Sequence, residues 1–108
     1  MNTDQLLKYC RFSKRYQGYC MLQECVEIVL EDEDYLLHLT DIYKKAAEKF
    51  DVSWSGLERD IRTSIDYSIR HGGQEQMETI SGGKFYSKPT VGEVIEIMAC
   101  YLKEHPEE

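Results

Sequence analysis

One predicted helix of this 108-residue sequence carries charged side chains with the chemistry to read DNA. Its apolar positions, which recur every four residues and predict one buried face, are Leu57, Ile61, Ile65 and Ile69. Glu58, Arg59, Arg62, Thr63 and Asp66 then point away from the core. Arginine can donate two hydrogen bonds to guanine N7 and O6 in the major groove, and glutamate can accept one from a cytosine amino group. The pattern favours base reading by Arg59 and Arg62, with Glu58 accepting from cytosine or orienting an arginine.

The same residues also fit an ordinary solvated helix. Glu58 and Arg62 are an i,i+4 pair, which stabilises any surface helix by only about 0.2–0.5 kcal/mol. Ser53 or Ser55 can cap this helix, and Ser55 with Glu58 matches a capping box, in which Glu58 merely closes the helix N-terminus. These residues alone do not separate a DNA-reading helix from a solvated one.

Residues 43–70 predict two helices joined by a tight turn, which is the layout of a helix-turn-helix DNA reader. The small side chain of Ala47 allows the helices to approach, and Val52 and Leu57 are expected to fill the wedge between them. Asp51 stands at the turn, where the backbone often adopts a left-handed conformation that glycine tolerates best and aspartate less well. An ordinary helical hairpin fits this spacing equally.

Helical periodicity extends along the rest of the chain, without repeats, low-complexity segments or convincing strands. The expected further helices are a short one capped by Thr3 or Asp4, one after Gly18, one over about 36–50, one over 74–80 beyond His71-Gly72-Gly73, and one opened by a capping box of Thr90 and Glu93. We therefore predict an all-α fold of about six helices around a helix-turn-helix at about 39–70. The length predicts a single domain over 1–108.

The net charge of −7 argues against DNA binding, because DNA-binding domains are typically basic. Residues 40–70 nevertheless carry six basic and six acidic residues, whereas 18–39 carry six acidic residues and no basic one. The densest run, which we call the acidic segment and expect to be a solvated turn, is Glu31, Asp32, Glu33 and Asp34. Acidic charge is thus concentrated away from the reading helix. We expect weak, salt-sensitive binding unless dimerisation or a partner adds contacts.

No pattern indicates a metal site, a cofactor or catalysis. The four cysteines, which form no CxxC pair and have no histidine at zinc-finger spacing, are Cys10, Cys20, Cys25 and Cys100. We interpret them as reduced, small hydrophobic residues on helices, and nothing beyond the presence of Cys10 and Cys20 indicates reversible oxidation there. The Gly-Gly-Lys run ending at Lys84 lacks the rest of a phosphate-binding loop, and Lys84 could instead contact the DNA backbone.

The sequence gives no indication of a membrane protein. No apolar run approaches the roughly 20 residues needed to span a bilayer, and no charged-then-apolar leader is present. We therefore expect a cytoplasmic protein.

Three ordered motifs resemble a known family. They are Ala47-Glu48-Lys49-Phe50, Ser55-Gly56-Leu57-Glu58-Arg59-Asp60-Ile61-Arg62 and Lys88-Pro89-Thr90. Together they are similar to the C-terminal DNA-binding effector domain of the response regulator that initiates sporulation in endospore-forming bacteria, and the similarity runs from about Gly18 to Leu102. The resemblance implies double-stranded DNA as the ligand, head-to-tail dimers on tandem sites, and contact with RNA polymerase. It favours DNA reading, for which our candidate residues are Ser55, Glu58, Arg59, Arg62, Thr63, Lys84 and Lys88.

Some positions depart from the family pattern. Gly56 stands where the family usually has arginine, and Thr63 stands where it has histidine, so two base- or phosphate-facing groups are absent. No stretch of the 108 residues corresponds to the family's phosphate-accepting receiver domain, so we expect either an excised fragment or a stand-alone effector, and the opening Met1-Asn2-Thr3-Asp4 favours the latter. Trp54, at the start of the reading helix, could contact a thymine methyl group, a phosphate or a partner.

The sequence thus predicts a sequence-specific DNA-binding transcription regulator without enzymatic activity. The alternative is an acidic protein-interaction module of the same fold that has lost DNA binding and modulates a related regulator or RNA polymerase.

Overall fold

A computed structural model describes residues 1–106 and contains only helices and loops. The elements are α1 (Thr3–Tyr9), α2 (Gln17–Glu31), the 3-10 helix η1 (Glu33–Leu37), α3 (Leu39–Phe50), α4 (Trp54–Arg70), α5 (Gly73–Ser81) and α6 (Val91–Glu104). The prediction of an all-α fold with about six helices is confirmed. No helix within residues 1–106 has both the length and the apolar character required to cross a bilayer.

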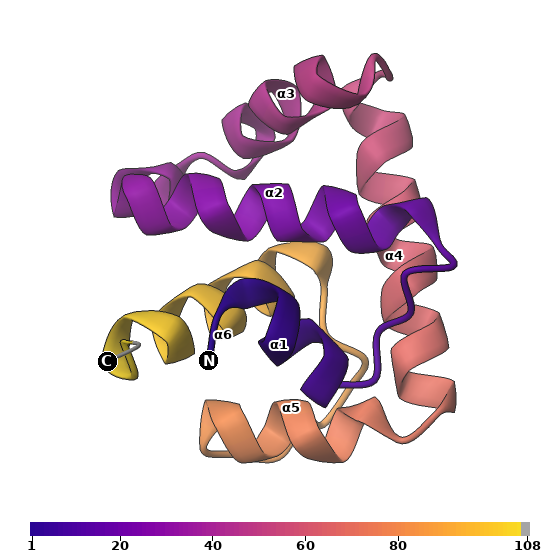
Figure 1. Cartoon of the computed structure of the whole chain (residues 1–108), viewed down its shortest axis with the longest axis vertical. Helices are drawn as coiled ribbons and strands as arrows, with labels where there is room; N and C mark the ends of the chain where they lie inside the picture. The colour runs from indigo at the N-terminus through magenta and orange to yellow at the C-terminus, as the bar shows by residue number, and fades with distance from the viewer. Residues whose placement is uncertain (107–108) are drawn as a thin grey trace.

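Helix α2 is the centre of the structure and packs against α4, α3 and α6. In Figure 1 it crosses the middle of the view, with α3 above it, α1 and α6 below it, and α4 upright at one end. Its apolar stripe is fully buried at Leu22, Cys25, Val26 and Val29, so the interior of the domain is built around this helix. The hydrophobic effect thereby fixes α3 and α4 against a common support.

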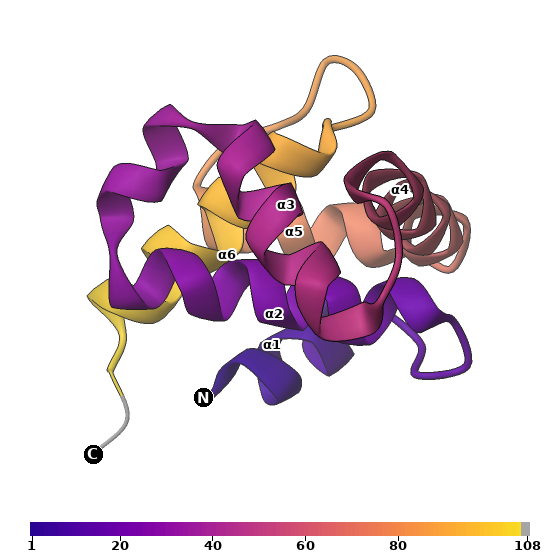
Figure 2. The same cartoon turned by 90° about the horizontal axis from the view of Figure 1, so that it is seen from above.

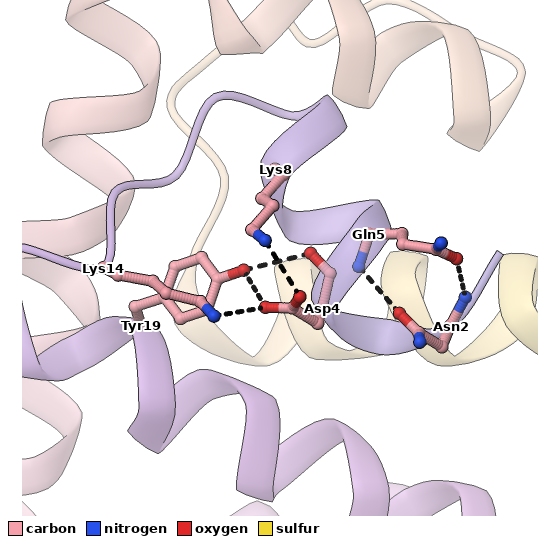
Figure 3. Close-up of polar contacts among 6 residues, drawn as sticks. All are labelled: Asn2, Asp4, Gln5, Lys8, Lys14 and Tyr19. Atoms are coloured by element: carbon pink, nitrogen blue, oxygen red, sulfur yellow. Dashed lines mark hydrogen bonds and ion pairs between the residues drawn. The ribbon is translucent and has the colours of Figure 1, made fainter.

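A polar cluster ties α1 to α2, as Figure 3 shows. The hydroxyl of the buried Tyr19 donates to the Asp4 carboxylate at 2.5 Å, and Lys8 and Lys14 lie 3.2 and 3.3 Å from the same carboxylate. The Tyr19 hydrogen bond, with help from the two lysines, lowers the pKa of Asp4 from 3.8 to about 2. Asp4 is therefore held as an anion by groups from both helices.

We expect this cluster to make the folded state sensitive to acid. A carboxyl group with a lowered folded-state pKa stabilises the fold above its unfolded value, here 3.8, and loses that contribution as the pH falls toward 2. The stability difference between the wild type and Asp4→Asn should therefore shrink between pH 5 and pH 3, as measured by urea unfolding. In Tyr19→Phe, which lacks the largest cause of the shift, the carboxyl of Asp4 should titrate nearer 3.8 by NMR. A difference that is the same at both pH values would contradict this interpretation.

The start of the chain differs from the sequence-based expectation. The cap of α1 is Asn2, whose side chain accepts from the Gln5 amide at 2.8 Å while Gln5 accepts from the Asn2 amide at 2.9 Å. The prediction of Thr3 or Asp4 as cap was wrong because both side chains have other partners. Thr3 is buried and donates to Glu27, and Asp4 faces Tyr19.

The acidic segment is not a simple turn. Glu31 ends α2, and the Asp32 side chain accepts from the Asp34 amide at 3.0 Å and caps η1. The four carboxylates are exposed, as expected. Because η1 continues to Leu37 and the backbone is irregular at His38, α3 begins at Leu39 and not near residue 36.

The end of α4 and the start of α6 follow the predicted signals. Gly72 has a left-handed backbone (φ 89°) and ends α4, as the glycine pair suggested. Thr90 and Glu93 form the expected capping box of α6, with hydrogen bonds of 3.1 and 3.2 Å. Between α5 and α6, residues 82–88 form a loop that projects from the molecule at the top of Figure 2. We refer to it below as the 82–88 loop.

Candidate nucleic-acid interface

The turn between α3 and α4 has the predicted left-handed residue. Asp51 adopts φ 54° and ψ 46°, which redirects the chain immediately after α3. Ala47 and Leu57 are buried where the two helices meet, as expected. Val52 is 36% exposed and does not fill the wedge, so that part of the prediction was wrong. The left-handed turn points Val52 outward, beside Trp54, which is itself 41% exposed and stacks on Tyr43 with ring centroids 6.3 Å apart.

Helix α4 begins at Trp54 and is capped by Ser53. The Ser53 hydroxyl accepts from the Gly56 amide at 3.1 Å. Ser55 already lies inside the helix, so the predicted capping box of Ser55 and Glu58 does not form. Glu58 is thereby left for Arg62, with which it forms an ion pair one turn along the helix. The exposed Ser55 lies beside the cap, 3.4 Å from the Ser53 hydroxyl oxygen.

Both apolar side chains and two serines of α4 are buried against the rest of the domain. Leu57, Ile61 and Ile65 are fully buried, and Ile69 is partly buried. Ser64 and Ser68, which the apolar pattern did not mark, are buried as well. Ser68 donates a 2.6 Å hydrogen bond to the Cys10 carbonyl oxygen of α1's C-terminal cap. Small serine side chains therefore allow neighbouring segments to approach α4 closely.

Helix α2 crosses α4 closely at Gly18. A Cβ atom at this position would lie well under 3.0 Å from the Asp60 carbonyl oxygen and 2.5 Å from the Ser64 hydroxyl oxygen. Glycine is therefore required there for the observed distance between the two helices. This contact and the buried isoleucines fix which side of α4 faces the solvent.

We call the solvent-facing side of this helix the outer face of α4, formed by Glu58, Arg59, Arg62, Thr63 and Asp66. Glu58 pairs with Arg62. Asp66 pairs with Lys88, which reaches the helix from the end of the 82–88 loop. Arg59 is exposed and forms no ion pair with any residue in 1–106. The carboxylates on this face are thus neutralised within the domain, while one guanidinium group is available for a ligand.

The structure brings most of the predicted site residues to one surface. Thr63 lies beside Arg59, and its hydroxyl donates to the Arg59 carbonyl oxygen at 3.2 Å. Lys88 joins the helix through Asp66, a partner 22 residues away that the sequence did not indicate. Lys84 is exposed in the 82–88 loop and makes no ion pair within the described part of the chain.

A hollow of about 320 Å³ lies beside the outer face, lined in part by Arg62, Lys88 and Tyr43. Burial and the nearby Glu58 carboxylate raise the pKa of Tyr43 to about 12. Its hydroxyl therefore stays protonated at neutral pH and remains a hydrogen-bond donor. The shared hollow shows that the start of α6 and the 82–88 loop adjoin the arginine-bearing part of α4.

The acidic segment lies at the opposite end of α2 from α4 (Figure 1). Helix α2 has 15 residues, so at 1.5 Å per residue it is roughly 22 Å long. Charges separated by more than about 8–10 Å are largely screened at physiological salt. The charge of the acidic segment therefore has little effect on the local potential at the outer face.

The cysteines fall into two groups. Cys10 and Cys25 are buried, as expected for small hydrophobic residues, and burial raises the pKa of each thiol to about 12. The thiolate needed for oxidation is thus strongly disfavoured at Cys10. Cys20 on α2 and Cys100 on α6 are exposed. Within residues 1–106, no three His, Cys, Asp or Glu side chains are arranged to hold a metal ion.

Two helices joined by a left-handed turn, the second with a buried inner side and a charged outer face, define a helix-turn-helix domain. Residues 3–102 match the family described as "Sporulation initiation factor Spo0A C terminal", and the chain belongs to this family. It is a family of DNA-binding regulatory domains and not of enzymes. The resemblance drawn from the three sequence motifs is confirmed.

Proposed function

We propose that this protein is a sequence-specific transcription regulator whose helix α4 enters the major groove of double-stranded DNA. The supporting observation is the outer face of α4, on which Arg59 is available while the Glu58 and Asp66 carboxylates are neutralised by Arg62 and Lys88. A rigid helix of this kind can place arginine at guanine edges. As a reader of a bacterial chromosome, the protein would act in the cytoplasm.

Base contacts are assigned to Glu58, Arg59, Arg62 and Thr63, and Ser55 is assigned to the DNA backbone beside the helix N-terminus. Lys84 and Lys88 supply positive charge from the 82–88 loop. Membership of the family supports binding as a dimer on tandem sites and contact with RNA polymerase as further parts of the proposal. We propose no catalytic step and no cofactor.

Binding to DNA is expected to be detectable and to weaken with salt, but less steeply than that of a domain with many phosphate contacts. Each neutralised phosphate contributes a slope of about −0.9 to log K against log salt, so about four contacts would weaken binding roughly a hundredfold between 50 and 200 mM. Fluorescence anisotropy with a pool of randomised duplexes at both salt concentrations measures this slope. Failure of the folded protein to bind any duplex at the lower salt would rule out the proposal.

The second candidate function is a protein-interaction module, which the exposed acidic segment favours. A variant with Glu31, Asp32, Glu33 and Asp34 replaced by glutamine or asparagine separates the two functions. For a DNA reader, this variant should bind DNA slightly more tightly, because only distant repulsion is removed. For an interaction module, the variant should lose its protein partner, and neither form should bind DNA.

A further inference from the structure

We propose that Tyr86 is a further DNA contact, whose hydroxyl donates a hydrogen bond to a backbone phosphate beside the groove entered by α4. The inference rests on the proposed function and adds a positioning residue to it. Tyrosine hydroxyls are among the groups that commonly bind DNA phosphates and thereby set the register of a protein on the duplex. Nothing in the three sequence motifs marks this residue.

Tyr86 is the most exposed large hydrophobic side chain among residues 1–106, with a relative exposure of 102%. Its ring packs on no part of the domain, whereas most other aromatic residues in 1–106 are at least partly buried or stacked. A fully hydrated tyrosine contributes nothing to the core by burial. Its position therefore calls for an explanation other than stability.

The 82–88 loop is held at both sides of Tyr86. On the N-terminal side, the Phe85 amide donates to the Glu78 carboxylate at 2.7 Å, and the Phe85 ring packs against the core. On the C-terminal side, Lys88 pairs with Asp66, and the following Pro89 is buried. Tyr86 is thus presented to solvent from an anchored segment, which limits the conformational entropy lost on binding.

The anchoring places Tyr86 next to the outer face of α4. Lys88 contacts Asp66, which lies one turn beyond Arg62 on that face. Tyr86 is two residues before Lys88, so their Cα atoms are at most about 7 Å apart. A duplex whose major groove holds α4 therefore passes within reach of the loop, which projects freely in Figure 2.

The charges around Tyr86 suit a phosphate. Lys84 is exposed on one side of it, and Lys88 on the other side cancels the negative charge of Asp66. The 82–88 loop itself contains no acidic residue. A neutral hydroxyl between two ammonium groups suits the DNA backbone, and the nearby Glu78 carboxylate is engaged by the Phe85 amide.

The test is the substitution Tyr86→Phe in the full chain, measured by anisotropy on a duplex selected by the wild type. Loss of one hydrogen bond to a charged phosphate should weaken binding roughly ten- to a hundredfold, equally for every base sequence. Because the hydroxyl is neutral, the salt slope should stay the same. Lys84→Gln, by contrast, should reduce the magnitude of the slope by about 1.

The matched control is Tyr9→Phe, which alters another exposed tyrosine, on α1, and should leave the affinity unchanged. Phosphate-ethylation interference then locates the contact, because ethylation of one flanking phosphate should impair the wild type but not Tyr86→Phe. If the wild type binds DNA and Tyr86→Phe binds it with the same affinity, the Tyr86 contact is overturned while the proposed function stands. The same result is expected if this tyrosine contacts a protein partner. Absence of any DNA binding by the wild type would overturn the proposed function and this inference together.

Discussion

Replacing Arg59 with alanine is expected to remove the preference for one base pair of the operator while the fold stays intact. A bidentate contact between arginine and guanine discriminates by about 1–3 kcal/mol. Arg59 is exposed and forms no ion pair within residues 1–106, so its loss should cost the folded state little. Mobility-shift assays on a selected operator and its single-base variants should place the loss at one position, and circular dichroism should show unchanged helix content.

Arg62→Ala provides an informative comparison, because Arg62 also neutralises Glu58. This variant should lose discrimination at a second base pair and also bind all duplexes more weakly, since the bare Glu58 carboxylate repels phosphates. Adding Glu58→Gln to Arg62→Ala should restore the affinity that was lost equally for all duplexes, but not the discrimination at the second base pair. Arg15→Ala, at an exposed arginine before α2, serves as the control for charge alone. Uniform weakening by Arg59→Ala across all base variants would mean that Arg59 binds a phosphate and reads no base.

The substitution Gly18→Ala is expected to destabilise the protein by about 1–3 kcal/mol, as overpacking of a close contact does. The added methyl group would collide with the Asp60 carbonyl oxygen, which is main chain and cannot rotate away. Alanine gains at most about 1 kcal/mol over glycine in helix propensity, so the clash should dominate. Chemical denaturation of both proteins measures the difference in the free energy of unfolding.

Gly83→Ala is the matched control, because no atom lies within 4 Å of a Cβ at that position, and it should leave stability nearly unchanged. If Gly18→Ala pushes α4 away from α2, DNA affinity should fall as well, because the outer face is then tilted. An equal or higher stability of Gly18→Ala would show that α2 and α4 can separate without cost, and that the close crossing is not essential.

Local patterns accounted for the helices and for several of their ends. The apolar spacing in α4 identified Leu57, Ile61 and Ile65 as buried, because a period of about 3.6 residues is a property of the helix itself. The Thr90 capping box formed as expected, since both of its hydrogen bonds are made within four residues. The left-handed Asp51 could be anticipated for the same local reason.

The cap of α4 shows where local patterns were ambiguous. Ser53 and Ser55 offer the same hydroxyl chemistry two residues apart, and only the position of the turn decided for Ser53. That choice released Glu58 to pair with Arg62. The exposure of Val52 also depends on the turn. The direction of the chain after Asp51 is set by how α3 and α4 pack.

The sequence by itself determined the all-α class, the helix-turn-helix and the outward position of Arg59 and Arg62, because these follow from residue spacing within single helices. The pairing of Lys88 with Asp66, the close approach of Gly18 to Asp60 and the burial of Ser64 and Ser68 were decided only by the tertiary structure. Each of these joins residues far apart in the chain. Such contacts depend on the angle and distance at which whole helices cross, and these are set by the packing of the complete core.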